Sequence, residues 1–261
     1  MTGGTNNLHG RKIWLTGASS GIGKAMAERL CEAGNHVIVT ARKADSLEPL
    51  KNQFPGKVTV VPGDISVPGS ENELRSRLAY EVDSLDTVIL NAGGCEYVDV
   101  DNYDHALVER VTKVNFLGFS RCLHASLPLL RKSSKNPHLV GISSASVFFG
   151  LPRAEAYGGT KAAMTYCLKS LRSDLFQHGI DVSIVYPGFV DTPLTRKNDF
   201  PMPGLMDTDT ATNIILQGIS RRKHEISFPK SLCWTLKVLE SLPVGLSKKI
   251  AQRMVRSGAA A

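Results

Sequence analysis

Short runs of β-branched and other apolar residues alternate along the chain with longer segments in which apolar residues recur every three or four positions. The runs lie at 13–15, 37–40, 58–61, 87–90, 138–143, 182–186 and 225–228. Runs of this length predict buried strands, and the periodicity between them, as from Ile22 to Ala33, predicts amphipathic helices. The alternation favours an α/β fold, a single Rossmann-type doubly wound parallel sheet with helices on both faces.

The pattern changes after the last predicted strand, where basic and apolar residues are interleaved. Pro243 and Gly245 break this part into two predicted helices. We therefore expect one domain with a C-terminal helical extension. Its parts are a disordered tail at 1–8, the sheet-forming part at 9–228, and a basic amphipathic extension at 229–261.

The net charge of the chain is concentrated in its C-terminal part, which includes this extension. The segment from Arg221 to Arg256 contains nine basic and two acidic residues and so carries the whole formal charge of +7. A basic amphipathic segment with a tryptophan, here Trp234, is typical of peripheral contact with an anionic membrane surface. The alternative is that the helices only cover the substrate pocket or a subunit interface. We expect no nucleic-acid partner.

The rest of the composition limits the cellular location and the kinds of site that we expect. No apolar run is long enough to span a membrane, and the N-terminus lacks the pattern of a secretory signal, so we expect a cytoplasmic protein, with the membrane surface as the alternative. The five cysteines include no Cys-x-x-Cys pair, and the seven histidines show no close ligand spacing. We therefore predict no metal and no disulfide framework.

A glycine-rich segment follows the first predicted strand directly. It runs Thr16-Gly17-Ala18-Ser19-Ser20-Gly21-Ile22-Gly23, and the helical pattern begins within it. Gly17 permits a tight turn, Gly21 lets the backbone approach a pyrophosphate, and Gly23 lets the helix pack closely on the strand. Because amides at a helix N-terminus favour an anion, the segment predicts a phosphate-binding loop.

Tyr157 and Lys161 are four residues apart on one face of a predicted helix. A free tyrosine titrates near pH ~10, so a neighbouring cation is expected to lower its pKa and make it a usable proton donor. Ser144 lies thirteen residues upstream of Tyr157, directly after the strand predicted at 138–143. The pair alone is a weak signal, since many surface helices carry this spacing.

Taken in order, these features resemble the short-chain dehydrogenase/reductase (SDR) family. The glycine spacing is similar to that family's T-G-x-x-x-G-x-G, and the resemblance covers about residues 9–228. The later matches are Asn91-Ala92-Gly93, Asn115, Ser144, Tyr157 with Lys161, and Pro187-Gly188 leading to Thr192. One departure is the missing Asp-Gly-Gly after the last strand, which puts the acyl-carrier substrate and tetramer contacts of many family ketoreductases in doubt.

The resemblance also implies where a dinucleotide binds. The residue after the second strand meets the adenosine ribose, and here Arg42 stands where a carboxylate would favour NAD, so we expect NADP(H). The alternative is that Arg42 only opens a solvated helix, and Asp64 likewise suits a helix cap. The expected cofactor-binding residues are Thr16, Gly17, Ser19, Ser20, Gly21, Ile22, Gly23, Arg42, Asp64, Ile65, Asn91, Ala92, Gly93, Tyr157, Lys161, Pro187, Gly188, Val190 and Thr192.

The implied catalytic residues are Asn115, Ser144, Tyr157 and Lys161. In the family pattern Tyr157 is the general acid in reduction, Lys161 also orients the cofactor ribose, Ser144 binds the carbonyl oxygen, and Asn115 holds a water relay. Without the family match, Ser144 would be read as a turn former and Asn115 as a surface residue. An alternative from another class is a non-catalytic NADP-binding sensor or interaction protein on the same fold.

The substrate is less clearly specified than the reaction. Apolar residues near the predicted site suggest a ketone or aldehyde of a lipid, acyl or polyketide-like compound, although they equally suit a core. They are Cys95, Val147, Phe148, Phe149, Leu151, Phe189 and Leu194. By resemblance we expect a homodimer or homotetramer that uses helices around 101–131 and 155–179.

Overall fold

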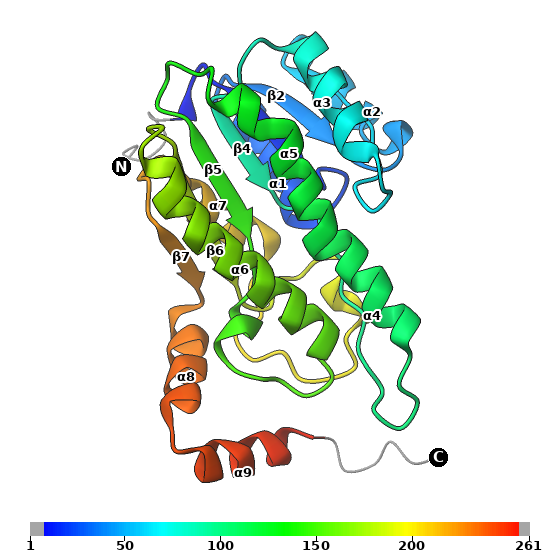
Figure 1. Cartoon of the computed structure of the whole chain (residues 1–261), viewed down its shortest axis with the longest axis vertical. Coiled ribbons are helices and arrows are strands. Elements are labelled where there is room, and N and C mark those ends of the chain that lie inside the picture. Colours follow the sequence, from blue (N-terminus) through cyan, green and yellow to red (C-terminus); the bar gives the residue numbers. More distant parts are fainter. Residues whose placement is uncertain (1–7, 256–261) are drawn as a thin grey trace.

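A seven-stranded parallel sheet lies between two layers of helices (Figure 1). The computed structural model describes residues 8–255. The strands are β1 (Lys12–Thr16), β2 (His36–Thr40), β3 (Val58–Val60), β4 (Thr87–Leu90), β5 (His138–Ile142), β6 (Asp181–Pro187) and β7 (Glu225–Phe228). Their order in the sheet is β3-β2-β1-β4-β5-β6-β7, and all neighbours pair in parallel. The predicted doubly wound α/β fold is therefore confirmed.

Most of the helices lie between successive strands, where they cover both faces of the sheet, and the last two follow β7. They are α1 (Gly21–Glu32), α2 (Glu48–Gln53), α3 (Ser70–Glu81), α4 (His105–Thr112), α5 (Gly118–Leu130), α6 (Glu155–Phe176), α7 (Thr208–Ser220), α8 (Lys230–Ser241) and α9 (Val244–Met254). Short turns of tighter or wider helix are η2 (Ala44–Ser46), η3 (Lys113–Leu117), η4 (Ala145–Phe148) and η5 (Thr195–Lys197). Helices α1, α2 and α7 pack on one face of the sheet, and α3, α5 and α6 pack on the other.

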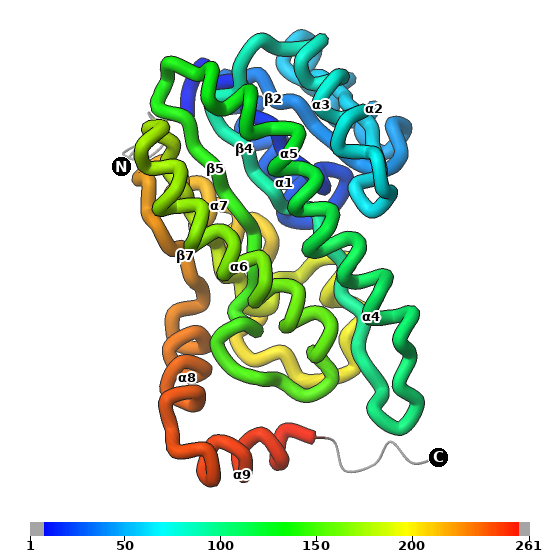
Figure 2. Tube along the Cα trace, in the orientation of Figure 1, coloured from blue at the N-terminus to red at the C-terminus, as the bar shows by residue number. Residues whose placement is uncertain are grey.

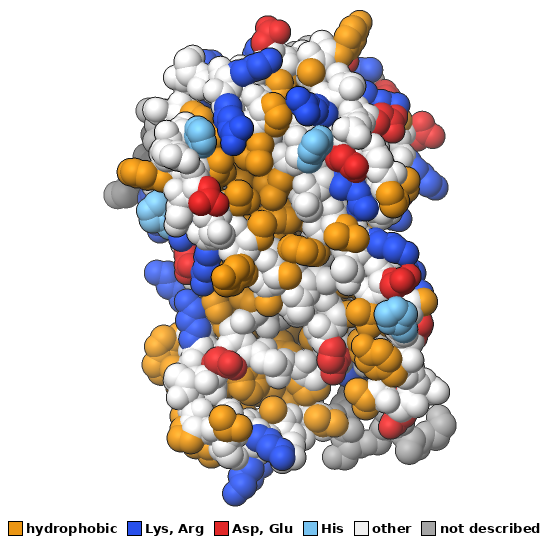
Figure 3. All heavy atoms as spheres, in the orientation of Figure 1, with side chains coloured by type: hydrophobic (Ala, Val, Ile, Leu, Met, Phe, Trp, Pro, Cys, Tyr) orange, Lys and Arg blue, Asp and Glu red, His pale blue; other side chains and the backbone are white. Residues whose placement is uncertain are grey.

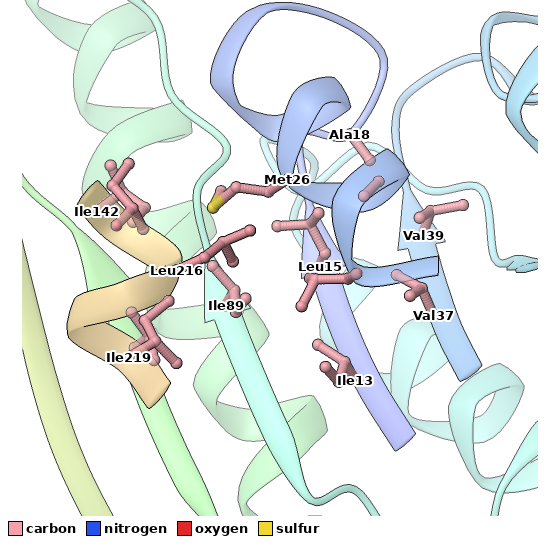
Figure 4. Packing of buried hydrophobic residues seen from close by; sticks show 14 of the residues in the cluster. Ile13, Leu15, Ala18, Met26, Val37, Val39, Ile89, Ile142, Leu216 and Ile219 are labelled. Carbon is pink, nitrogen blue, oxygen red and sulfur yellow. The ribbon is translucent and has the colours of Figure 1, made fainter. Parts of the chain in front are cut away.

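The alternation of side chains along β1 shows how the sheet builds two cores. Ile13 and Leu15 point to the α1 and α7 side, where they meet Met26 and Ile219 (Figure 4). Trp14, between them in sequence, belongs to the opposite cluster with α3, α5 and α6. All three β1 side chains are fully buried, as expected for a central strand covered on both faces.

The strand order reverses between β1 and β4, which are neighbours in the sheet although two strands separate them in sequence. In open α/β sheets, ligands bind at this position, outside the carboxyl ends of the strands. The loops after β1, β4, β5 and β6 all end at this edge. The sheet topology therefore brings together the segments that the sequence singled out.

The expected tail at 1–8 and the expected extension at 229–261 both lie partly outside the described residues. Of the expected tail, only Leu8 is described, and it is buried, with its carbonyl accepting a hydrogen bond from Asn35 Nδ2 (2.6 Å). Leu8 therefore belongs to the core and not to a tail. At the other end, α8 and α9 separate at Leu242 and Pro243, where two helices were predicted.

Candidate active site

The glycine-rich loop between β1 and α1 is built on two glycines that no other residue replaces easily. Gly17 has a φ of 71°, a left-handed conformation that favours glycine. A Cβ atom at Gly23 would lie 2.0 Å from the Gly17 carbonyl oxygen, so α1 approaches the loop too closely for any side chain there. Ser19 and Ser20 are exposed at the start of α1. This is the geometry expected of a phosphate cradle.

The loop after β4 is tied to the loop after β1. Thr16 Oγ1 accepts hydrogen bonds from the backbone N–H groups of Asn91 and Ala92, both at 3.1 Å. Asn91 Nδ2 in turn donates to the Gly17 carbonyl (3.1 Å). The sequence-predicted residues of the two loops therefore form one braced unit at the switch point.

The segment after β6 meets the same loop from the other side. A Cβ atom at Gly21 would lie 3.1 Å from Thr192 Cγ2, which places Thr192 against the glycine loop. Pro187 is buried at the end of β6, and Gly188 N donates to the Phe228 carbonyl (2.7 Å). Val190 pairs with Met206 in an isolated bridge that fixes the base of the following loop. The expected set Pro187, Gly188, Val190 and Thr192 is therefore assembled at the site.

The residues expected around the adenosine lie along the adjoining edge. Arg42 is exposed directly beyond β2, and among the described residues no hydrogen bond or ion pair engages its side chain. Asp64 Oδ1 accepts from the N–H (2.9 Å) and the hydroxyl (2.6 Å) of Ser66, so it forms a local turn and not the helix cap that the sequence allowed, since α3 begins at Ser70 with Gly69 as its N-cap. Ile65 is buried against Gly118 of α5.

Asn115 lies in a single wide turn of helix, η3, that joins α4 to α5. Such π-type turns are frequent at functional sites. Its side chain is buried and makes two hydrogen bonds to the backbone of the loop after β4. Nδ2 donates to the Gly94 carbonyl (2.9 Å), and Oδ1 accepts from Gly94 N (2.8 Å). Nδ2 also donates to Thr160 Oγ1 (3.1 Å), which donates to the Tyr157 carbonyl (2.8 Å). Asn115 thus connects α6 with the loop after β4.

Tyr157 and Lys161 lie on the first turns of α6, facing the end of β5. Lys161 is only 4% exposed, and its Nζ donates to the Ile142 carbonyl (2.8 Å). The same Nζ lies 5.9 Å from the centre of the Tyr157 ring. Ser144 caps η4 by accepting from Ser146 N (3.1 Å), and its hydroxyl hydrogen-bonds the Tyr157 phenol. Ser144, Tyr157 and Lys161 are therefore brought together.

Burial determines the charge states of this pair. It raises the pKa of Tyr157 to about 12, although the hydrogen bond with Ser144 opposes the rise. It lowers the pKa of Lys161 from 10.5 to about 8. The lowering of the Tyr157 pKa expected from Lys161 does not appear, because the ammonium points to the Ile142 carbonyl and desolvation of the phenolate dominates. Near neutral pH the phenol is protonated and the lysine is mostly charged.

A group of contacts that the sequence did not predict holds the loop after β6 to the site. We define the loop latch as Tyr97, Arg153, Asn198, Asp199 and Phe200. Tyr97 Oη donates to Asn198 Oδ1 (2.8 Å), and its ring packs edge-on against Phe200. Arg153 NH1 pairs with Asp199 (3.1 Å), and its guanidinium lies 5.3 Å from the Tyr97 ring centre. Figure 2 shows the loop passing near the start of α6.

Two of the expected apolar wall residues have a different role. Phe149 is buried in a small cluster with Ala145, Cys233 and Leu236, and Phe148 packs at 4.8 Å against the buried Tyr186 ring. They form core beneath α8, as the alternative interpretation of this set allowed. Sequence reasoning also missed Thr160, whose position inside the Tyr-Gly-Gly-Thr-Lys segment was visible but whose link to Asn115 depends on the fold.

A doubly wound sheet with a glycine-rich loop at its switch point defines the class of dinucleotide-binding α/β proteins. The family model described as short chain dehydrogenase matches residues 11–201. A Myxococcus xanthus protein described as an uncharacterized oxidoreductase is 34% identical over 94% of this chain and 97% of its own length. The chain belongs to the short-chain dehydrogenase/reductase family, whose enzymes use NAD or NADP to interconvert CH–OH and C=O groups of small molecules.

Two further relatives extend the comparison. A fatty acyl-CoA reductase of Acinetobacter baylyi is 29% identical and covers 85% of this chain and 77% of its own length. The crystal structure of a short-chain type dehydrogenase/reductase from Mycobacterium marinum has a TM-score of 0.75 at 23% identity, covering 84% of this chain and 94% of that one. The second match supports the fold alone.

Residues 8–255 contain neither a metal-binding cluster nor a membrane-spanning helix. Within that range no three His, Cys, Asp or Glu side chains are placed to share a metal ion. Of the helices described there, none has both the length and the hydropathy to cross a bilayer. The five cysteines are all unpaired thiols.

Proposed function

We propose that the protein is an NADP(H)-dependent oxidoreductase that reduces a ketone or aldehyde of an apolar substrate to an alcohol through Ser144, Tyr157 and Lys161. The observation that carries the proposal is the buried Lys161 beside a hydrogen-bonded pair of Ser144 and Tyr157 hydroxyls, at the carboxyl edge of the sheet. Burying a lysine is costly, so a buried lysine beside two hydroxyls at the carboxyl edge of the sheet is a functional candidate.

The residues present fit a bound dinucleotide. A Cβ atom at Gly23 would clash with the loop, and one at Gly93 would lie 3.2 Å from Asn115 Oδ1 and 3.3 Å from Lys161 Nζ. Gly23 thus lets α1 pack closely on the phosphate loop, and Gly93 leaves room beside Asn115 and Lys161. The glycine loop would hold the pyrophosphate, and Asn91, Ala92, Gly93, Pro187, Gly188, Val190 and Thr192 would flank the nicotinamide half. When bound, the reduced nicotinamide supplies a hydride.

The chain's own residues manage the proton and the developing charge. Tyr157, protonated near neutral pH, donates its phenolic proton to the carbonyl oxygen as the carbonyl carbon accepts the hydride. Ser144 hydrogen-bonds the same oxygen and stabilises the charge that grows on it. Lys161, fixed at the Ile142 carbonyl, holds a positive charge near the resulting phenolate. Asn115 positions Thr160 and Gly94, and would hold the water that returns a proton to Tyr157.

Two features favour NADP(H) and reduction. Arg42 presents an unengaged guanidinium where the adenosine ribose is expected, and no carboxylate occupies the end of β2. A guanidinium there suits the additional phosphate of NADP. We infer reduction as the cellular direction because the NADP pool is usually kept reduced.

The apolar substrate is supported by the side chains around the loop latch and by one relative. Phe189 and Phe200 stack edge-on at 6.0 Å in the loop after β6, and Tyr97 adds a third ring. The Acinetobacter baylyi relative is described as a fatty acyl-CoA reductase. We therefore infer a lipid, acyl or polyketide-like carbonyl compound as the substrate class.

The test is NADPH-dependent reduction of a panel of long-chain and short-chain carbonyl compounds, followed by the absorbance of the reduced cofactor. Tyr157→Phe removes one acidic proton and little volume, so we expect turnover to fall by at least about a hundredfold while NADPH binding changes little. Tyr166→Phe, an exposed tyrosine of the same helix, is the matched control. Near-parental turnover in Tyr157→Phe would refute the assignment, and NADPH binding without turnover of any compound would favour the sensor alternative.

We also infer a cytoplasmic homo-oligomer. Leu117, directly before α5, and Tyr166, in α6, have exposed large side chains. Helices α5 and α6 are the ones that we expect at the subunit contact. Light scattering coupled to gel filtration tests this, and a mass equal to one chain at all concentrations would reject it.

A further inference from the structure

Helix α8 packs on the molecule through one face and leaves the other exposed. Cys233 and Leu236 are buried against Ala145 and Phe149, next to η4. Leu232 and Leu239 support the same contact. These four apolar side chains of the extension are therefore covered by contacts within the protein.

A second set of apolar residues in the described part of the extension faces outward. Trp234 is 68% exposed on α8, and Val244, Leu246 and Met254 are exposed on α9. Helix α9 buries no residue completely, and of its side chains only Ala251 packs against the cluster of Cys233 and Leu236. We define the terminal face as the exposed side chains of α8 and α9. The exposed apolar side chains of α9 therefore belong to a helix that packs little on the rest of the protein.

The terminal face is also strongly basic. Between Lys230 and Val255 there are five basic residues and one acidic residue, Glu240. The basic residues are Lys230, Lys237, Lys248, Lys249 and Arg253. Figure 3 shows hydrophobic and basic side chains next to one another at the end of the molecule that α8 and α9 form. In Figure 1, α9 runs across that end, below the carboxyl edge of the sheet.

We propose that the terminal face docks the protein on the surface of an anionic phospholipid bilayer. Exposed aromatic and aliphatic side chains enter the headgroup region, while lysine and arginine side chains contact the phosphates. Tryptophan is enriched at this interface because its ring is apolar and its N–H is polar. The combination of apolar stripe, tryptophan and net positive charge gives both contributions that peripheral binding needs.

A second copy of the chain is the competing occupant of this face. Two terminal faces in contact would bring together ten basic and two acidic side chains, with like charges opposing each other. That repulsion disfavours self-association through this face but strengthens attraction to an anionic surface. The charge therefore favours lipid over a second copy.

Docking through this face would also place the candidate active site close to the bilayer. Helix α8 packs on η4, and Ser144 immediately precedes η4. If the substrate is an apolar carbonyl compound, as in the proposed function, it would reach the site from the bilayer. The docking itself needs no catalysis, so it is tested independently of activity.

The experiment uses the full-length protein and two kinds of vesicle, phosphatidylcholine alone and phosphatidylcholine mixed with phosphatidylglycerol. We expect sedimentation with the mixed vesicles at low salt, and release at high salt. Fluorescence adds a local readout because the chain has two tryptophans, Trp14 fully buried and Trp234 exposed. Emission should shift to shorter wavelength on binding and lose its accessibility to iodide, a change that Trp14 cannot produce.

Matched variants assign the effect to the terminal face. Each basic residue near an anionic surface contributes about fivefold to binding, so Lys248→Glu with Lys249→Glu should weaken it by more than about twentyfold. Arg131→Glu with Lys132→Glu reverses the same charge at the end of α5 and should change binding little. Trp234→Ala should weaken binding several-fold, whereas Phe176→Ala, at the exposed end of α6, should not.

Three results would overturn the proposal. The first is no binding to the mixed vesicles at low salt. The second is equal loss of binding in the α9 and α5 charge reversals, which would indicate attraction to the protein as a whole. The third is dissociation of an oligomer by Trp234→Ala with vesicle binding unchanged, which would assign the face to a second copy. Circular dichroism and NADPH binding confirm that each variant remains folded.

Discussion

Lys161 shows how strongly a single residue depends on its surroundings. Burial lowers its pKa to about 8, so this ammonium loses its proton far more easily than an exposed lysine. If its charge supports proton donation by Tyr157, kcat/KM for reduction should fall about tenfold for each pH unit above about 8. The measurement is the pH dependence of kcat/KM with saturating NADPH.

Lys161→Arg separates this titration from others in the same pH range. Arginine stays charged, so a variant that retains some activity should lose the fall near pH 8 even if its rate is lower throughout. An unchanged profile in Lys161→Arg would assign the titration to another group.

Arg42 is the residue for cofactor choice. Replacing it with aspartate removes a charge-assisted contact typically worth ~1.5–3 kcal/mol, so the preference for NADPH over NADH should fall by roughly 10- to 150-fold. The measurement is the ratio of kcat/KM for the two cofactors. Lys51→Asp makes the same charge change on α2 and serves as the control. Equal kcat/KM for NADH and NADPH in the parent would contradict the assignment.

The contacts of the loop latch limit the motion of the loop after β6. Tyr97→Phe removes the hydrogen bond to Asn198, typically worth ~1 kcal/mol, but keeps the ring contact with Phe200. We expect trypsin to cut this loop, at exposed Arg196 or Lys197, several times faster in the variant. The substrate KM should rise while kcat changes less.

The loop-latch prediction has a control in Tyr103→Phe, since Tyr103 is an exposed tyrosine in the connection before α4. Trypsin susceptibility equal to that of the parent in both variants would mean that the Tyr97 contact does not hold the loop.

His138 makes the unfolding free energy of the protein depend on pH. It is buried at the start of β5, with Nε2 hydrogen-bonded to Ser183 Oγ (2.7 Å). Burial, together with the charges of Arg222, Arg11 and His224, lowers the pKa of His138 from 6.5 to about 3. The unfolded chain therefore takes up a proton that the folded protein excludes. Stability is full above about pH 6.5 and falls toward about pH 3.

The expected loss from this one histidine is about 2 kcal/mol of unfolding free energy between about pH 7 and about pH 5. Urea titrations at both pH values measure it, and His138→Gln should show a smaller loss than the parent. His105→Gln, at an exposed position, should leave the pH dependence unchanged. The same pH dependence in all three proteins would contradict the role of His138.

The sequence alone predicts the fold well because the strands are local signals. Each of the seven apolar runs lies at the place of a strand, and the family match orders Thr16, Asn91 and Tyr157 along the chain. The confirmed sheet topology explains why these residues meet, since parallel strands end at one edge.

What the sequence did not predict depends on contacts between distant segments. The loop latch joins residues 97 and 153 to residues 198–200, and nothing in the spacing indicates that link. The prediction that Lys161 lowers the pKa of Tyr157 was wrong in direction. Spacing along a helix indicates where Lys161 lies, but it does not indicate the cost of burying the phenolate. Both depend on the assembled molecule.

Arg153 carries a consequence for how variants of this protein would be selected. Its φ of 66° is left-handed, and a glycine would remove the roughly 1 kcal/mol that this conformation costs an arginine. Glycine would in turn lose a similar amount to the greater freedom of the unfolded chain. A screen for product formation would therefore register Arg153→Gly more strongly than a screen for heat resistance, because the exposed ion pair with Asp199 adds little to stability but helps to hold the loop after β6.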